Sequence, residues 1–320
     1  METRERAIQR VAGTATRPGP GGEQQTRGEA PLVTERAVSP RMRSVAVRLW
    51  FSAMALAALP PLVSAQDQPR VRLTPAQQEE FLRTAKVVES RPIGTGVTNA
   101  LRLTLEKDGF RHDAEFQSID IQQREFRTVT DVEMNFKDTY KFNIAGYRLA
   151  VLLGIGDMVP VSIERHIQGR YGALTWWIDD VLMDETRRLV TKTEAPDALR
   201  WNREIDVVRV FDQLIANTDR NTGNLLIDKQ WRIWMIDHSR AFRMHTWLLK
   251  PRDLRHCDRA LLERLRALTG EALNEQLSPW LNSWERKGIL ARRDLIVRFF
   301  DGSAARTSEL GGLFDRPTRN

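Results

Sequence analysis

Hydrophobic and polar residues alternate in the first half of the chain as strands require. Apolar side chains occupy every second position from Leu101 to Leu105, and we expect residues 87–121 to form an antiparallel meander of three strands. A glycine-bearing turn joins the first two of these strands. Before them, Thr74 and Gln77 have the spacing of a capping box, which predicts a helix to about residue 85.

A segment with the apolar spacing of a helix follows the meander in the sequence. Residues 136–154 repeat apolar positions with helical periodicity, which predicts one long helix. Two further strands are expected at 158–165 and 173–178, joined by a turn at 168–170. The first half of the folded region is therefore predicted to be β-rich with one long helix.

The second half is predicted to be mainly helical. Apolar residues at 207–215 indicate a buried helix that leads to Asp219, and a hairpin is expected at 225–237. Further helices are expected around 258–269, 271–286 and 289–300, with Gly270 as a C-cap. The last residues, 302–320, are predicted to be a disordered tail.

The N-terminal residues have the composition of a leader. Residues 1–41 are rich in Arg, Gly, Pro, Thr and Glu without apolar periodicity, so we expect them to be a disordered extension, with Met42 as the true start. Residues 42–65 combine a basic start, a short apolar run and small residues, as a signal peptide does. Cleavage after Ala65 would export the protein to the periplasm or the exterior. The alternative is an uncleaved anchor, the one membrane association that the sequence predicts.

Charge and cysteine content narrow the class of partner. The formal net charge of +7 suits nucleotides, phosphates or anionic surfaces. Zinc-finger spacing, arginine-rich tracts and RNA-binding motifs are absent from the sequence, so nucleic acid is not an expected partner. Cys257 is the single cysteine, which excludes an internal disulfide, and no second cluster completes a metal site around it.

Three short polar side chains form the candidate catalytic constellation. Asp219 and Asn224 stand five positions apart, and Asp237 ends an apolar strand after the hairpin. Protein kinases space a catalytic Asp, an Asn and a metal-binding Asp in this way. We therefore expect Asp219 to orient or deprotonate an acceptor hydroxyl, Asn224 and Asp237 to hold Mg²⁺, and Arg220 to steady the loop or the phosphate. Because Asn, Asp, Thr and Gly also favour turns, a plain polar connection is the alternative.

The same residues carry a family resemblance. Residues 219–224 (Asp-Arg-Asn-Thr-Gly-Asn) resemble the Asp-Arg-His-x-x-Asn loop of phosphoinositide 3/4-kinases, and 236–238 (Ile-Asp-His) resembles their Ile-Asp-Phe-Gly element. Similar skeletons occur in secretory-pathway casein kinases and HipA-type kinases, and 145–160 is similar to a helix-to-strand segment of bacterial members. The resemblance implies a two-lobed α+β kinase-like fold that uses ATP and Mg²⁺, with a β-rich N-lobe at 66–180 and a helical C-lobe at 181–301.

Two positions depart from the kinase pattern. Kinases pair a Lys on the third strand with a Glu on the following helix. Here Gln117 stands at the Lys position and Asn143 at the Glu position, and the resemblance implies that both line the nucleotide site. Lys137 and Lys141 are candidates for the missing charge. Nucleotide phosphates are expected beneath the glycine-bearing turn, at Gly94 and Gly96, unless it is an ordinary hairpin turn.

Three functions follow from these observations. The first is an ATP- and Mg²⁺-dependent phosphotransferase acting on a hydroxyl of a protein or small molecule. The second is an exported pseudokinase or binding module, favoured by the amides at Gln117 and Asn143 together with the leader. The third is an envelope scaffold with an unrelated α+β fold.

Overall fold

The computed structural model describes residues 72–94, 100–127, 132–304, 312–317 and 319. They belong to one of two units into which the chain divides, Gln68–Asn320. The predicted extension, the signal peptide and its cleavage point lie outside the described residues. Within the described part, no helix is both long and apolar enough to cross a membrane.

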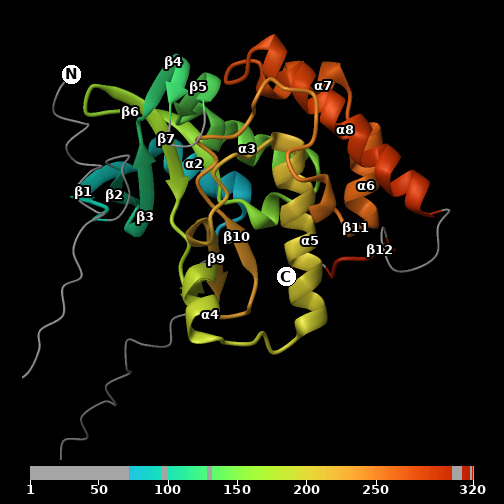
Figure 1. Ribbon diagram of the computed structural model, residues 1–320. Coiled ribbons are helices and arrows are strands. Elements are labelled where there is room, and N and C mark those ends of the chain that lie inside the picture. Colours follow the sequence, from blue (N-terminus) through green and yellow to red (C-terminus); the bar gives the residue numbers. More distant parts are fainter. Residues whose placement is uncertain (1–71, 95–99, 128–131, 305–311, 318, 320) are drawn as a thin grey trace, which may run out of the picture. The chain divides into compact units, whose positions relative to one another are not determined.

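A five-stranded antiparallel sheet forms one side of this unit (Figure 1). Its spatial order is β1-β2-β3-β7-β6. The strands are β1 (Lys86–Pro92), β2 (Leu101–Lys107), β3 (Phe110–Gln117), β6 (Ser162–Ile167) and β7 (Arg170–Trp176). The predicted meander is confirmed in β1, β2 and β3, and the predicted turn at 168–170 joins β6 and β7.

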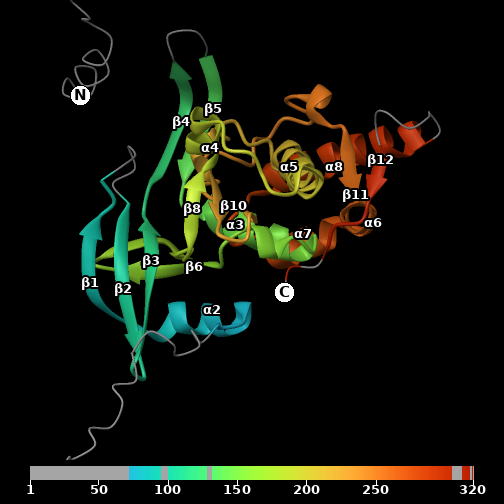
Figure 2. The same cartoon turned by 90° about the horizontal axis from the view of Figure 1, so that it is seen from below.

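The first described helix, α2 (Pro75–Thr84), packs against this sheet (Figure 2). Its predicted capping box is present: the Thr74 hydroxyl accepts a hydrogen bond from Gln77 N, and the Gln77 side chain accepts one from Thr74 N. Phe81 contacts the rings of Phe110 and Trp176 at centroid distances of 5.2 and 5.8 Å. The helix therefore closes one face of the sheet with aromatic packing.

The helix predicted at 136–154 begins later than expected. Residues Val132–Thr139 form β5, which pairs with β4 (Asp120–Arg127), and α3 spans Lys141–Leu152. Phe136 satisfied helical spacing in the sequence, yet it pairs with Gln123 and stacks on Phe126 at 4.2 Å. Cross-strand pairing with a partner strand outweighed the local pattern, which does not reveal that partner.

The other side of the unit is mainly helical (Figures 1 and 2). The helices are α4 (Glu185–Thr191), α5 (Ala198–Ile215), α6 (Arg259–Ala267), α7 (Gly270–Leu277) and α8 (Ser283–Ala304). A small sheet contains β8 (Val181–Asp184), β9 (Leu225–Asp228) and β10 (Ile233–Met235), and β11 (His256–Asp258) pairs with β12 (Gly312–Phe314). Short 3₁₀ turns are η1 (Gly156–Met158), η2 (Thr222–Asn224) and η3 (Pro251–Asp253). The predicted buried helix before Asp219 is α5, and the predicted hairpin is β9–β10.

Two predictions near the C-terminus do not match the structure. Gly270 opens α7 behind the N-cap Thr269 instead of closing α6. Within the segment predicted to be a disordered tail, β12 pairs in parallel with β11, and the Arg319 side chain is 3% exposed and bonded to Glu204. These residues are ordered by contacts with distant parts of the chain, which composition does not show.

Helix α3 lies between the large sheet and the helical side (Figures 1 and 2), and it packs on β6, β7 and α7. A single hydrophobic cluster includes residues from the sheet, from α3 and from α5. At Gly146 a β-carbon would lie 3.1 Å from the His238 ring, so glycine allows α3 to approach the segment after β10 closely. This approach positions the candidate site.

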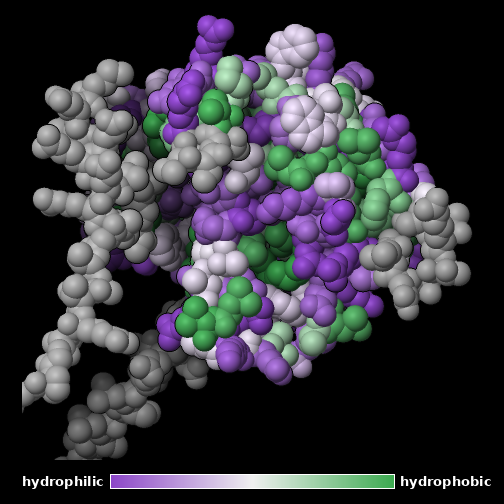
Figure 3. Space-filling model, in the orientation of Figure 1, coloured by the Kyte–Doolittle hydropathy of each residue, from purple (hydrophilic) through white to green (hydrophobic). Residues whose placement is uncertain are grey.

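Hydrophilic side chains cover much of the face shown in Figure 3, and hydrophobic side chains gather over α4. Leu189 and Val190 on this helix are 52% and 77% exposed. Helix α4 also contacts η2, where the Thr186 and Thr222 hydroxyls lie 2.7 Å apart. The residues of η2 are therefore braced by α4.

Candidate active site

The loop after α5 is shaped by its own polar side chains. Ala216 takes a left-handed conformation at the end of α5, and the side-chain Oδ1 of Asn217 accepts a hydrogen bond from Asp219 N at 3.0 Å. The Asn224 side-chain amide donates to the Asp219 carbonyl at 3.4 Å. These local bonds leave the Asp219 side chain 45% exposed, as a group that meets an acceptor must be.

Arg220 holds this loop against the strand that precedes Asp237. Its guanidinium contacts the Asp212 carboxylate at 3.0 Å and donates to the carbonyls of Asn224 and Ile236 at 3.0 and 2.7 Å. Ile236 N donates in turn to the Asn224 carbonyl at 3.1 Å. These bonds hold the loop against the end of the strand. A contact between Arg220 and a phosphate stays a prediction.

Asp237 has an unusual backbone conformation. Its φ is +50°, in the left-handed region that Asp tolerates better than most residues. Its carboxylate accepts a hydrogen bond from Ser239 N at 3.3 Å. His238 is 2% exposed and packs edge-on against Phe211. Burial, followed by the charge of Arg220, holds the pKa of His238 well below its usual value.

Gln117 and Asn143, predicted to stand at the positions of the kinase Lys and Glu, are in direct contact. Asn143 Nδ2 donates to Gln117 Oε1 at 2.5 Å, and Asn143 Oδ1 accepts from His238 N at 2.6 Å. Since a backbone N–H is always a donor, the contact with His238 determines which way the Asn143 amide faces. The amide network therefore connects β3, α3 and the residue after Asp237.

A small cavity lies beside this network. Its volume is about 10 Å³, which is room for about one water molecule. It is lined by Glu115, Asn143, Val159, Pro160, Ser162, Thr175, Met235, Ile236, Asp237 and His238. The cavity shows that strand β3, helix α3 and the segment around Asp237 meet at one place, where little free space remains.

The sequence analysis missed two carboxylates in this region. Burial, and then the charge of Asp237, raises the pKa of Glu115 to about 7. Burial also raises the pKa of Asp138, with further contributions from Asp237 and Asp219 that the Ser239 hydroxyl and Arg240 oppose. Period-two alternation puts Glu115 on the same face of β3 as Gln117, so that position could have been found from the sequence. Asp138 could not, because it lay in a predicted helix.

The glycine-bearing turn is described only in part. Gly94 lies at a bend, and a β-carbon there would have no neighbour within 4 Å. Gly96 lies outside the described residues. The expected contact of these two glycines with a nucleotide stays a prediction.

The oxygen donors of the site suit one class of metal. The part of the chain that the structure describes has no group of three or more His, Cys, Asp and Glu residues that could enclose an ion. Mg²⁺ does not require such a cage, because it usually takes one or two carboxylates and completes its shell with water and phosphate oxygens. The oxygens of Asn224 and Asp237 fit that requirement.

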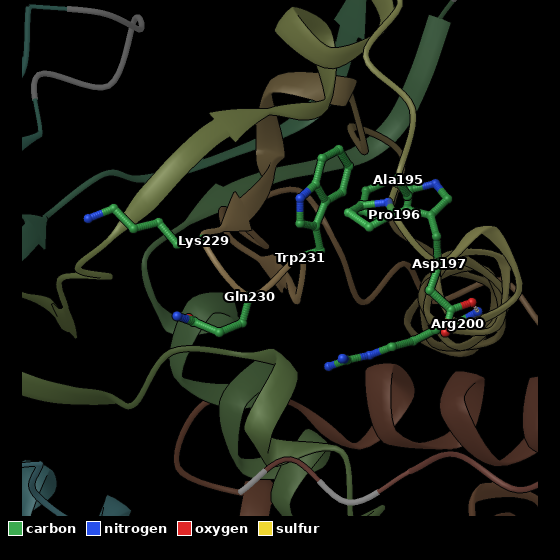
Figure 4. A pocket seen from close by; sticks show the side chains of 8 residues that line it. Ala195, Pro196, Asp197, Arg200, Lys229, Gln230 and Trp231 are labelled. Carbon is green, nitrogen blue, oxygen red and sulfur yellow. Dashed lines mark hydrogen bonds between the residues drawn. The ribbon is translucent and has the colours of Figure 1, made fainter.

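A second cavity lies away from these residues (Figure 4). Its volume is about 150 Å³, and its lining is Ala195, Pro196, Asp197, Arg200, Trp201, Lys229, Gln230 and Trp231. These residues come from the loop before α5, the first turns of α5 and the β9–β10 turn. None is a candidate catalytic residue, so the smaller cavity beside Asp237 marks the candidate active site.

Comparisons with known proteins identify the fold. The sequence matches no protein-family model and no curated protein. The structure of hydra Fam20 with sugar is similar at a TM-score of 0.56 and 15% identity, covering 76% of this chain and 93% of that chain. The Golgi casein kinase (TM-score 0.47, 13% identity, 70% and 73% covered) and the Helicobacter pylori proinflammatory kinase CtkA (0.37, 10%, 67% and 92%) are more distant. The first likeness shows that the chain has a kinase-like α+β fold, with a β-rich part and a helical part.

Proposed function

We propose that this protein is a phosphotransferase that moves the terminal phosphate of ATP, with Mg²⁺, to a hydroxyl of a protein or small molecule. The observation that carries the proposal is the position of Arg220. Its guanidinium binds the carbonyl of Asn224 and the carbonyl of the residue before Asp237. One side chain thereby joins the loop and the strand end that bear the three predicted catalytic groups.

Each group has a chemical task in this proposal. Phosphoryl transfer depends on positioning and charge stabilisation more than on covalent chemistry. Asp219, which is exposed, orients the acceptor hydroxyl and takes its proton. Asn224 and Asp237 hold the metal through oxygen atoms, and a bound Mg²⁺ neutralises phosphate charge. Because the cavity beside Asp237 has a volume of only about 10 Å³, nucleotide entry requires the surrounding side chains to move.

Binding and turnover of ATP test the proposal. Isothermal titration of the full-length chain with ATP and Mg²⁺ should show binding that EDTA removes and that Asp237→Ala abolishes. Asp219→Asn should retain binding and lose about 10²–10⁴-fold in turnover, as loss of a general base does. Asp253→Ala, at an exposed position of η3, is the matched control and should leave both unchanged. A wild-type chain that neither binds nor turns over ATP contradicts the proposal.

The amide network favours a second candidate function. In place of a charged Lys–Glu pair, the chain has a neutral contact between Gln117 and Asn143, and a pseudokinase that binds a partner needs no phosphate-binding Lys. Thermal unfolding discriminates the two, because a ligand at 100 times its Kd stabilises a protein by about 2.7 kcal/mol. Stabilisation by ATP without turnover supports the pseudokinase, and turnover refutes it. Export through residues 42–65 is part of either proposal.

A further inference from the structure

Gln117 stands at the position of the kinase Lys, and the two lysines considered as replacements are already paired. Lys137 Nζ contacts Glu285 Oε1 at 2.5 Å, and the Glu285 side chain is 2% exposed. Lys141 Nζ contacts Asp120 Oδ2 at 2.9 Å, at the start of β4. Moving either lysine to a phosphate would take the ion-pair partner away from its carboxylate, at a buried position in the case of Glu285.

Two arginines near the loop are also held in place. The Arg220 guanidinium is bonded to Asp212 and to two carbonyls, as described above. The Arg243 side chain is 8% exposed, lies 2.7 Å from Glu133, and donates to the Lys137 carbonyl and the Thr218 hydroxyl at 2.8 and 3.2 Å. Both guanidinium groups are part of the framework that holds the loop.

Arg240, three residues after Asp237, differs from all of these. Its guanidinium lies 3.5 Å from Asp219 Oδ2 and 3.7 Å from Glu133 Oε2, and both separations exceed the range of a good hydrogen bond. Its Nε, like that of Arg243, is buried without a hydrogen-bond partner among the described residues, but Arg243 donates through its other guanidinium nitrogens. The guanidinium lies over the Phe136 ring at 5.1 Å. Its charge is thus close to the candidate base while its donors make no close bond within the described part of the chain.

The backbone of Arg240 is nevertheless well positioned. Its carbonyl accepts a hydrogen bond from the Thr218 hydroxyl at 3.0 Å, which ties it to the residue before Asp219. The charge of Arg240 also lowers the pKa of Asp138, against the effect of burial. The Arg240 guanidinium makes no close hydrogen bond among the described residues and lies next to the group that would meet the acceptor. It is therefore suited to bind a phosphate that approaches the same acceptor.

We propose that Arg240 forms a subsite for the terminal phosphate in the candidate active site and supplies positive charge there. The inference rests on the proposed function. A guanidinium binds phosphate oxygens with two parallel hydrogen bonds. The present contact of Arg240 with the Asp219 carboxylate, at 3.5 Å, is weaker than such a pair of bonds. Movement of Arg240 to the phosphate also frees Asp219 for the acceptor hydroxyl. In the proposed function Asp219 binds the acceptor hydroxyl, which receives the terminal phosphate. Arg240, which lies beside Asp219, therefore contacts the terminal phosphate and not the phosphates nearer the ribose.

Separate measurement of ATP and ADP affinity tests this subsite. Titration of the full-length chain with the Mg²⁺ complex of each nucleotide should show about 10- to 100-fold weaker ATP binding in Arg240→Gln, the effect of losing hydrogen bonds to a charged group. ADP affinity should change by less than about threefold, since ADP has no terminal phosphate to lose. Arg240→Met, which keeps the length of the stem over Phe136, should behave alike. Arg252→Gln, exposed on η3, is the matched control and should leave both affinities unchanged.

The outcomes separate this inference from the proposed function. A wild-type chain that binds ATP, together with a folded Gln or Met variant whose preference for ATP over ADP is unchanged, overturns the subsite alone. Equal weakening of ATP and ADP also overturns it, because the contact would then lie elsewhere on the nucleotide. A wild-type chain that binds neither nucleotide overturns the proposed function and the subsite together.

Discussion

The amide network between β3 and α3 allows a prediction about stability that does not depend on catalysis. Asn143→Leu removes a side chain that bonds to Gln117 Oε1 and to His238 N. Gln117 is 3% exposed, so its oxygen and the His238 N–H would both lose their partners inside the fold. Each unsatisfied buried group costs about 1–3 kcal/mol, and we expect Asn143→Leu to reduce the free energy of unfolding by about 2–6 kcal/mol.

A second substitution makes the prediction sharper. Gln117→Leu alone leaves only the Asn143 side-chain N–H unpaired and should cost about 1–3 kcal/mol. The double variant removes both amides and leaves only the His238 N–H without its partner, again about 1–3 kcal/mol. The double variant should therefore be no less stable than Asn143→Leu alone, although it carries one more substitution. Strong positive coupling of this kind is expected only for side chains in direct contact.

Equilibrium urea unfolding of the full-length chain, without metal or nucleotide, measures these values. Asn202→Leu is the matched control, because Asn202 is exposed on α5; it should change stability by less than about 0.5 kcal/mol. The reasoning is refuted if Asn143→Leu costs less than about 1 kcal/mol, or if the cost of the double variant equals the sum of the two single costs.

Three further predictions concern other parts of the chain. Arg292→Met should lower the free energy of unfolding by at least about 3 kcal/mol, because the fully buried guanidinium donates to the carbonyls of Leu214, Arg243 and His245; a loss below about 1 kcal/mol in urea unfolding contradicts this. Burial of the Cys257 thiol, followed by the charge of Asp258, raises its pKa to about 12. Between about pH 9 and pH 12 the folded protein therefore keeps the thiol proton, whereas the unfolded chain releases it. Stability should be fully retained below about pH 9 and fall between about pH 9 and 12, by up to about 1.4 kcal/mol per pH unit; an unchanged slope in Cys257→Ala would refute this cause. N-terminal sequencing of exported protein should begin at Gln66, and a start before Gln66 contradicts cleavage after Ala65.

Much of the local structure follows from short-range rules. The capping box at Thr74, the alternation of β2 and the helical spacing of α5 depend on neighbouring residues, and each led to the correct type of element. Elements that depend on a distant partner were missed. Residue 136 satisfied helical spacing yet forms a strand, because β4 lies beside it. Arg292, next to Arg293 in a charged stretch, is fully buried, and three backbone carbonyls from distant segments accept its hydrogen bonds.

In the candidate site, too, some features follow from the sequence and others only from the tertiary structure. The spacing of Asp219, Asn224 and Asp237 is a property of the sequence, and it predicted the kinase-like fold that the structure confirms. The catalytic roles of these residues stay a prediction. Only the tertiary structure decided that the amides of Gln117 and Asn143 bond to each other and that Arg220 serves the framework. It also decided that the Arg240 guanidinium lies beside Asp219 without a close bond to any described residue. The physical reason is that spacing and periodicity act over a few residues. Burial, hydrogen-bond partners and the pairing of charges arise between segments that only the folded chain brings together.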